Sequence, residues 1–108
     1  MLIPASATRV FVALSPVDLR GSFNRLFALT QNVLRQDPLS GHWFVFTKRN
    51  RLKILFWDGS GLWVLNKRLE RGRFSWPQGS EACTPLHPGE LEALVVSGRK
   101  DWHRVEQH

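Results

Sequence analysis

The sequence predicts a single α+β domain: an antiparallel β-meander of about four to five strands packed against one long helix, with a second, short helix near the C-terminus. The chain has 108 residues, enough for one hydrophobic core and too few for two. Residues 19–34 repeat apolar side chains at spacings of three and four, as an amphipathic helix does. Three later segments are rich in β-branched and aromatic residues and are separated by turn sequences. We assign residues 1–98 to the domain and residues 99–108 to a polar tail.

The first strand and the long helix are expected in the N-terminal third. Arg9–Leu14 is rich in β-formers and is stopped by Ser15-Pro16. Ser15 is a suitable N-cap and Pro16 suits the first helical position, so the helix is predicted to begin there. Asp37-Pro38 ends its apolar pattern, which gives a long helix over residues 16–36.

A three-stranded meander is predicted in the middle of the chain. Its strands are His42–Thr47, Leu52–Trp57 and Leu62–Asn66, joined by the basic loop Lys48–Arg51 and the glycine-rich turn Asp58–Gly61. A turn centred on Gly59-Ser60 predicts the pairs Phe56 with Trp63, Ile54 with Leu65, Lys53 with Asn66 and Leu52 with Lys67. Parts of these strands are apolar on both faces, so the long helix should cover one face and the other should be partly hidden.

The last third of the chain is expected to contain little sheet. Phe74–Trp76 is a candidate for a short fourth strand, and Glu81–Leu86 is predicted to be a loop. The short helix is predicted to begin at Pro88, with Gly98 beyond its end.

The net charge of +6 is concentrated in residues 48–73. This segment holds eight basic residues and two acidic ones, whereas the rest of the chain has seven of each. The basic residues are Lys48, Arg49, Arg51, Lys53, Lys67, Arg68, Arg71 and Arg73. A meander returns both basic runs to one end of the sheet, where arginines could bind phosphates. The segment therefore predicts a nucleic-acid-binding patch, with Trp76 as a candidate for base stacking. The alternative is a solvated sheet end whose charges only prevent aggregation.

No catalytic or metal site is predicted. The basic segment offers only Asp58 and Glu70, fewer carboxylates than a two-metal nuclease needs. Asp58 is expected to begin its turn, and Glu70 to pair with Arg73 or Lys67. The histidines lack metal-ligand spacing, and the single cysteine, Cys83, can form neither an internal disulfide nor a cysteine-based zinc site. We expect no cofactor, no membrane-spanning segment and a cytoplasmic location.

Several motifs follow one another in a fixed order. They are Asp18–Arg20 with Gly21 and Phe23, Asp37–Phe46, Lys53–Gly61, Lys67–Phe74 and Trp76-Pro77. From about Ile3 to Leu94, their order resembles the accessory proteins of the bacterial insertion sequence sixty-six group, called TnpB or Orf2-like proteins, which are unrelated to the RNA-guided nuclease of the same name. The chain departs from the family at His87, where a threonine or serine often precedes the proline of the last helix, and at the inserted-looking Ser97–Lys100.

The resemblance implies a non-catalytic role in DNA transposition beside a separate DDE-type transposase. With the basic patch, it predicts binding to DNA at transposon ends or to a DNA–transposase complex. One alternative is an adaptor that contacts the transposase through the exposed part of the sheet and through Trp102, with the patch facing an acidic surface. The other is an RNA-binding regulator. The sequence shows no base-reading helix and no RNA-recognition signature, so no sequence specificity is predicted.

Overall fold

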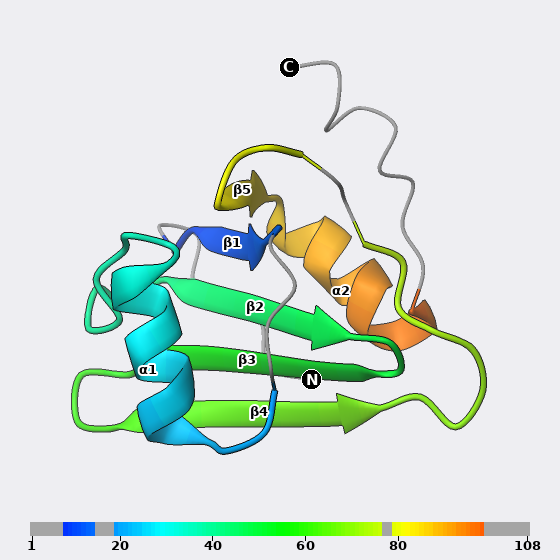
Figure 1. The fold of residues 1–108 in the computed structure, drawn as a ribbon, viewed down its shortest axis with the longest axis horizontal. Coiled ribbons are helices and arrows are strands. Elements are labelled where there is room, and N and C mark those ends of the chain that lie inside the picture. Colours follow the sequence, from blue (N-terminus) through cyan, green and yellow to red (C-terminus); the bar gives the residue numbers. More distant parts are fainter. Residues whose placement is uncertain (1–7, 15–18, 77–78, 99–108) are drawn as a thin grey trace.

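A five-stranded sheet forms the centre of the computed structural model, which describes residues 8–14, 19–76 and 79–98 (Figure 1). In spatial order its strands are β4 (Leu62–Arg68), β3 (Arg51–Trp57), β2 (Trp43–Lys48), β1 (Val10–Ala13) and β5 (Cys83–Leu86). Strands β2, β3 and β4 form the predicted antiparallel meander. Strand β1 runs parallel to β2 and antiparallel to β5. The expectation of a purely antiparallel sheet was therefore wrong, and the sheet is mixed.

The predicted register of the β3–β4 hairpin is confirmed. Phe56 lies opposite Trp63, Ile54 opposite Leu65, Lys53 opposite Asn66 and Leu52 opposite Lys67. The turn explains why this register is fixed. The Asp58 carboxylate accepts hydrogen bonds from the backbone N–H groups of Ser60 at 2.8 Å and Gly61 at 2.9 Å, and Gly59 adopts a φ of +100°. Glycine reaches this conformation without the steric cost that a side chain would add.

Three expectations about the strands were wrong: those for residues 81–86, for Phe74–Trp76 and for the direction of β1. Residues 81–86 were predicted to be a loop, yet Cys83–Leu86 forms strand β5. Pro85 obscured it, because proline weakens a strand pattern although an edge strand accepts it. Phe74–Trp76 forms no strand; Phe74 is instead buried in the core. Strand β1 is parallel to β2 because the connection between them passes through a helix, which returns the chain to the end where β1 began.

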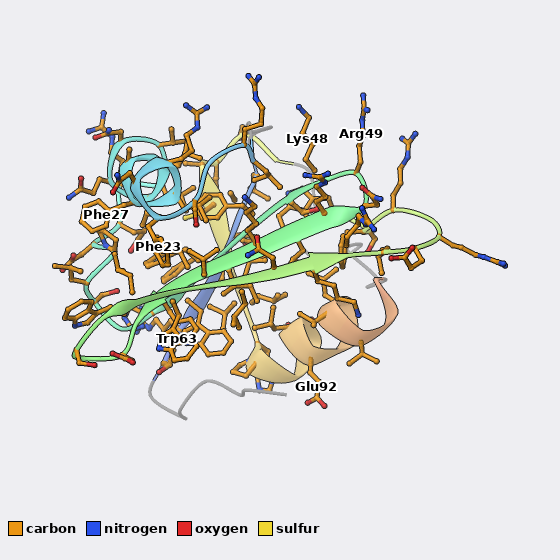
Figure 2. All side chains as sticks on the ribbon, turned by 90° about the horizontal axis from the view of Figure 1, so that it is seen from below. Phe23, Phe27, Lys48, Arg49, Trp63 and Glu92 are labelled. Atoms are coloured by element: carbon orange, nitrogen blue, oxygen red, sulfur yellow. The ribbon has the colours of Figure 1, made fainter. Side chains whose placement is uncertain are left out.

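The two helices lie on opposite faces of the sheet, as Figure 2 shows with α1 above it and α2 below. Helix α1 spans Phe23–Asn32 and helix α2 spans Pro88–Ser97. The prediction of one long helix over residues 16–36 was wrong, because Gly21 (φ +85°) and Arg35 (φ 56°) adopt left-handed backbone conformations on either side of α1. The predicted cap at Ser15-Pro16 lies outside the described residues. Within the described ranges, neither helix has the length and apolar character that crossing a membrane requires.

Each face of the sheet buries its own hydrophobic cluster. Val45 and Ile54 pack on the face that carries Leu91 and Leu94 of α2. On the other face, Phe44, Phe46 and Leu55 form a cluster with Leu26 of α1. The apolar pattern on both faces of β2 and β3 therefore reflects a second helix rather than a partly hidden surface.

Helix α2 begins with a histidine cap. Nδ1 of His87 accepts a hydrogen bond from the Gly89 N–H at 3.0 Å, and Glu90 accepts one from the His87 N–H at 3.1 Å. This reciprocal pair is a capping box, in which the imidazole replaces the hydroxyl of a threonine or serine. The departure at His87 therefore preserves the local structure by different chemistry.

We predict that His87→Ala lowers the free energy of unfolding by about 1 kcal/mol, because alanine cannot accept the hydrogen bond at the start of α2. His87→Thr should retain most of the stability, since its hydroxyl can make the same bond. Urea denaturation of the wild type and both variants measures the effect. Equal stability of the alanine and threonine variants would contradict the capping role.

Candidate nucleic-acid interface

The two basic runs lie at the same end of the sheet. Lys48 pairs with Arg51 across β2 and β3, and Arg51 pairs with Arg68 across β3 and β4. The segment that follows β4 then returns along the β2–β3 turn, where the Leu69 N–H donates to the Asn50 carbonyl and the Phe74 N–H to the Arg49 carbonyl, both at 2.8 Å. The expected gathering of the two runs is therefore confirmed, while their binding of nucleic acid stays a prediction.

Six of the eight basic residues are exposed, and we call them the basic end. They are Lys48, Arg49, Arg51, Arg68, Arg71 and Arg73. Figure 2 shows Lys48 and Arg49 pointing away from the sheet on the side that carries α1. These six side chains come from a hairpin turn, three strand ends and the following loop, so folding assembles them from residues far apart in the sequence.

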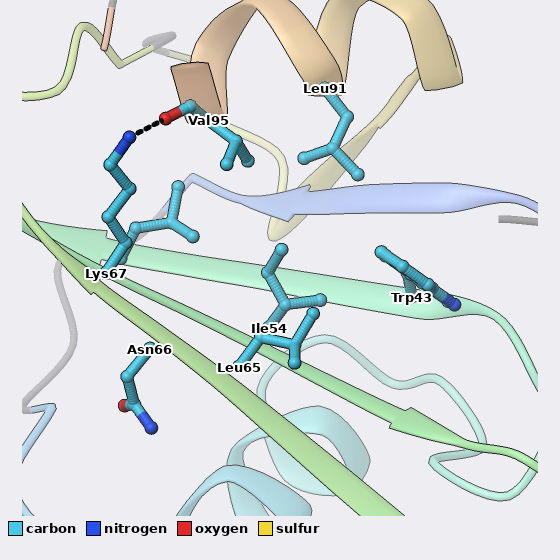
Figure 3. A pocket seen from close by; sticks show the side chains of 8 residues that line it. Trp43, Ile54, Leu65, Asn66, Lys67, Leu91 and Val95 are labelled. Carbon is cyan, nitrogen blue, oxygen red and sulfur yellow. Dashed lines mark hydrogen bonds between the residues drawn. The ribbon is translucent and has the colours of Figure 1, made fainter. Parts of the chain in front are cut away.

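The other two basic residues of the segment, Lys53 and Lys67, donate hydrogen bonds to backbone carbonyls of the protein. The Lys53 ammonium donates to the carbonyls of Leu19 and Gly21, both at 2.6 Å, and so attaches the segment before α1 to the sheet. The Lys67 ammonium donates to the Val95 carbonyl in the last turn of α2 at 2.5 Å (Figure 3). A cation at this position also interacts favourably with the negative end of the helix dipole. The sequence carried one signal for Lys67, since the predicted register places it beside Leu52 on an apolar face.

The loop that carries Arg71 and Arg73 is also attached to α2. The Ser75 N–H donates to the Gly98 carbonyl at 2.8 Å. Gly98 ends α2 with a φ of +73°, and a Cβ there would lie 2.8 Å from Cδ1 of Leu69. Only glycine fits this position without displacing the start of the loop.

Little negative charge accompanies the basic end in the described part of the chain. Glu70 lies 3.6 Å from Arg68, which corrects the expectation that it pairs with Arg73 or Lys67. Both side chains are largely exposed, so this ion pair contributes little to stability and neutralises little of the patch. Asp58 lies at the opposite end of β4, beyond Trp57 and Leu62.

Asp58 has a structural role in its turn. Besides the two backbone bonds, its carboxylate accepts hydrogen bonds from the Trp63 indole N–H at 2.7 Å and the Ser60 hydroxyl at 3.0 Å. These bonds, that of Trp63 foremost, hold the pKa of Asp58 well below its usual range. Across the described ranges, no three histidine, cysteine, aspartate or glutamate side chains gather in a way that could hold a metal ion.

The remaining candidates for chemistry are packing or capping residues. Burial, and secondarily the charge of Glu81, raises the pKa of the half-buried Cys83 thiol, which makes it a poor nucleophile. Nδ1 of His42 accepts a hydrogen bond from the Arg9 N–H at 3.0 Å, as Nδ1 of His87 does at α2. His103 and His108 lie outside the described residues.

Trp76 packs against the protein. Its half-buried ring contacts the cluster on the α2 face, and its indole N–H donates to the Ala13 carbonyl at 2.6 Å. This placement gives Trp76 a structural role that the sequence did not reveal. We therefore leave Trp76 out of the interface that we propose, and base stacking by Trp76 stays a prediction.

An apolar groove that the sequence did not predict lies between α2 and the sheet (Figure 3). Its volume is about 230 Å³, and its lining includes Trp43, Leu65, Leu91 and Val95. On the same face, Trp43 stacks on Phe56 at 4.4 Å between ring centroids, and Phe56 stacks on Trp63 at 6.1 Å. Trp63 is 47% exposed on the edge strand β4. This row of aromatic rings therefore reaches the surface.

Comparison with known proteins gives one family and two relatives. The model of a family described as "IS66 Orf2 like protein" matches residues 8–107. Two uncharacterized proteins of Sinorhizobium fredii (strain NBRC 101917 / NGR234) are similar over 109 aligned residues. One, y4jC, is 38% identical and the alignment covers 99% of this chain and 92% of the relative; the other, y4hO, is 37% identical with 99% and 93% covered. No solved structure matches the chain.

We predict that Lys53→Met lowers the free energy of unfolding by about 1.5–3 kcal/mol, because it leaves two carbonyls without their charged donor. Lys48→Met is the matched control and should change stability by no more than about 0.5 kcal/mol, since the Lys48 side chain is exposed. Urea denaturation of both variants measures the difference. Equal losses would show that Lys53 has no special structural role.

We predict that Asp58→Asn destabilises the protein at neutral pH and that its deficit relative to the wild type shrinks below about pH 4. The folded-state pKa of Asp58 is lowered, so its ionised form stabilises the fold above the unfolded-state pKa and loses this effect as the pH falls through the folded-state pKa. Trp63→Phe keeps the ring but removes the main donor, and should shift the stability profile in the same direction by less. Denaturation from pH 2.5 to 7 checks this; a pH-independent deficit would contradict it.

Proposed function

The chain belongs to the IS66 Orf2-like family, and on that premise we propose that it is a non-catalytic accessory protein of bacterial DNA transposition. In this proposal it binds DNA at transposon ends, or a complex of DNA with the transposase, through the basic end. The family membership supports the role in transposition, and the charge distribution supports the contact with DNA.

The observation that carries the proposal is the concentration of six exposed cations at one end of the sheet, of which only Arg68 forms an ion pair with another described residue. Each cation that neutralises a DNA phosphate releases counterions, and this entropy gain drives binding that does not depend on sequence. Five of the six are arginines of the loops and strand ends, whose planar guanidinium groups can bind phosphate through two bonds. We therefore propose that the protein contributes affinity for DNA and that sequence selection belongs to another component.

The non-catalytic part of the proposal has its own support. The resemblance implies a separate DDE-type transposase, and within the described ranges the acidic side chains nearest the basic end do not form a metal-binding group. We propose that the transposase performs the chemistry in the bacterial cytoplasm, while this protein binds the DNA or the complex of DNA with the transposase.

The adaptor function is the second candidate, and the groove beside α2 favours it. Exposed Trp63 and the apolar lining of the groove are features that recur at protein interfaces. The groove and Trp63 lie on the α2 face, whereas Lys48, Arg51 and Arg68 lie on the α1 face. An adaptor surface and a DNA surface could therefore coexist, and the two functions can be tested separately.

We predict that the logarithm of the binding constant for duplex DNA falls linearly with the logarithm of salt concentration, with a slope of about −5 for five or six phosphate contacts. Fluorescence anisotropy with a labelled duplex at several salt concentrations measures this slope. A slope near zero would contradict phosphate contact. Competition with matched RNA tests the RNA-binding alternative.

We predict that Arg68→Glu with Arg71→Glu abolishes most duplex binding while leaving capture of the transposase intact. Each reversal replaces an attractive contact with repulsion from phosphate. Arg9→Glu with Arg35→Glu is the matched control, because Arg9 flanks the start of β2 and both side chains are exposed away from the basic end. Loss of transposase capture with DNA binding retained would instead support the adaptor.

A further inference from the structure

A row of three cations crosses the α1 face of the sheet at the basic end. Lys48, Arg51 and Arg68 lie directly opposite one another on β2, β3 and β4. Neighbouring strands are about 4.8 Å apart, so the three side chains start within about 10 Å. Like charges at directly opposite positions destabilise a sheet. An anion placed among them would remove that repulsion.

A hollow lies beside this row. Its volume is about 350 Å³, and it is lined by Arg51, Leu52, Lys53, Asn66, Lys67 and Arg68. Lys53 and Asn66 are paired across β3 and β4, next to the pair of Arg51 and Arg68. The Lys53 ammonium is held by the Leu19 and Gly21 carbonyls, which fixes one side of the hollow. Four of the six residues that line the hollow are thus basic.

The basic end offers no exposed aromatic ring within the described residues. Among the described residues, the exposed large aromatic side chains are Phe23, at the start of α1, and Trp63, on the α2 face, and neither belongs to the basic end. Trp76 is half-buried and bonded to Ala13, and Phe74 is buried. Proteins that bind single strands without sequence preference rely on aromatic rings on which the unpaired bases stack. The basic end provides charge without such a platform.

We propose that the hollow between β3 and β4, with Lys48, Arg51 and Arg68 along it, is a phosphate site that takes the backbone of double-stranded DNA in preference to single-stranded DNA. The proposal rests on the DNA-binding function proposed above and specifies the form of DNA and the residues that contact it. In duplex DNA the bases are already stacked, so a surface that offers only cations loses nothing by lacking aromatic rings. Arg51 and Arg68 can each donate two hydrogen bonds to a phosphate.

The test compares a labelled duplex with its separate strands by fluorescence anisotropy at several salt concentrations. We expect tighter binding of the duplex than of either strand. Arg51→Gln with Arg68→Gln should weaken duplex binding at least tenfold and reduce the salt slope by about 2, the value for two lost phosphate contacts. Arg9→Gln with Arg35→Gln is the matched control for charge and should retain wild-type affinity. Thermal denaturation verifies that both double variants fold.

The outcomes separate this inference from the proposed function. Tighter or equal binding of single strands would overturn the preference for duplex while leaving DNA binding intact. Equal weakening by the two double variants would overturn the assignment of the phosphate site. Absence of salt-dependent binding to any of the DNA probes would overturn both the inference and the DNA-binding function on which it rests.

Discussion

Burial of the central strands on both faces is the constraint on which the rest of the structure depends. Phe44 and Phe46 point to one side of β2, and Trp43 and Val45 to the other, so a single covering helix would leave one set in water. A fully buried side chain of this kind contributes roughly 1.5–3 kcal/mol relative to its exposed state. The chain therefore places α1 and α2 on opposite faces. Each helix is short, and the end of the sheet near Lys48 is left for polar and charged side chains.

The elements specified by local chemistry were predictable from the sequence. The β3–β4 register follows from the turn that Asp58 and Gly59 form, and the start of α2 follows from Pro88 and Glu90. The elements that depend on distant contacts were not predictable. Strand β5 exists because β1 provides its hydrogen-bond partners, and helix α1 is short although Leu19 and Leu34 beyond its ends remain buried. A buried apolar pattern indicates which residues face the core but not whether the backbone between them is helical.

In the candidate site, too, some features follow from the local sequence and others depend on contacts between distant residues. The position of the basic residues at one end follows from the meander alone, so the sequence was sufficient to predict it. The sequence could not show that Lys53 and Lys67 have a different role from the six residues of the basic end. Their carbonyl partners are 28 or more residues away in the chain, so only the three-dimensional structure reveals them. A lysine of a basic run can therefore serve the fold while its neighbours face solvent. The packing of Trp76 against Ala13 has the same explanation.

The loop that carries Arg71 and Arg73 is attached to α2, so these two segments form a cooperative unit. Gly98 contacts Leu69 closely and accepts a hydrogen bond from Ser75, while Lys67 holds the last turn of the helix. Local opening of the helix end would release the loop, and immobilising the loop on a ligand would disfavour that opening. The stability of the C-terminal end of α2 is thus linked to ligand binding at the basic end, although this part of the helix contributes no residue to that surface. A protein partner that binds the end of α2 would therefore change the affinity of the basic end for its ligand.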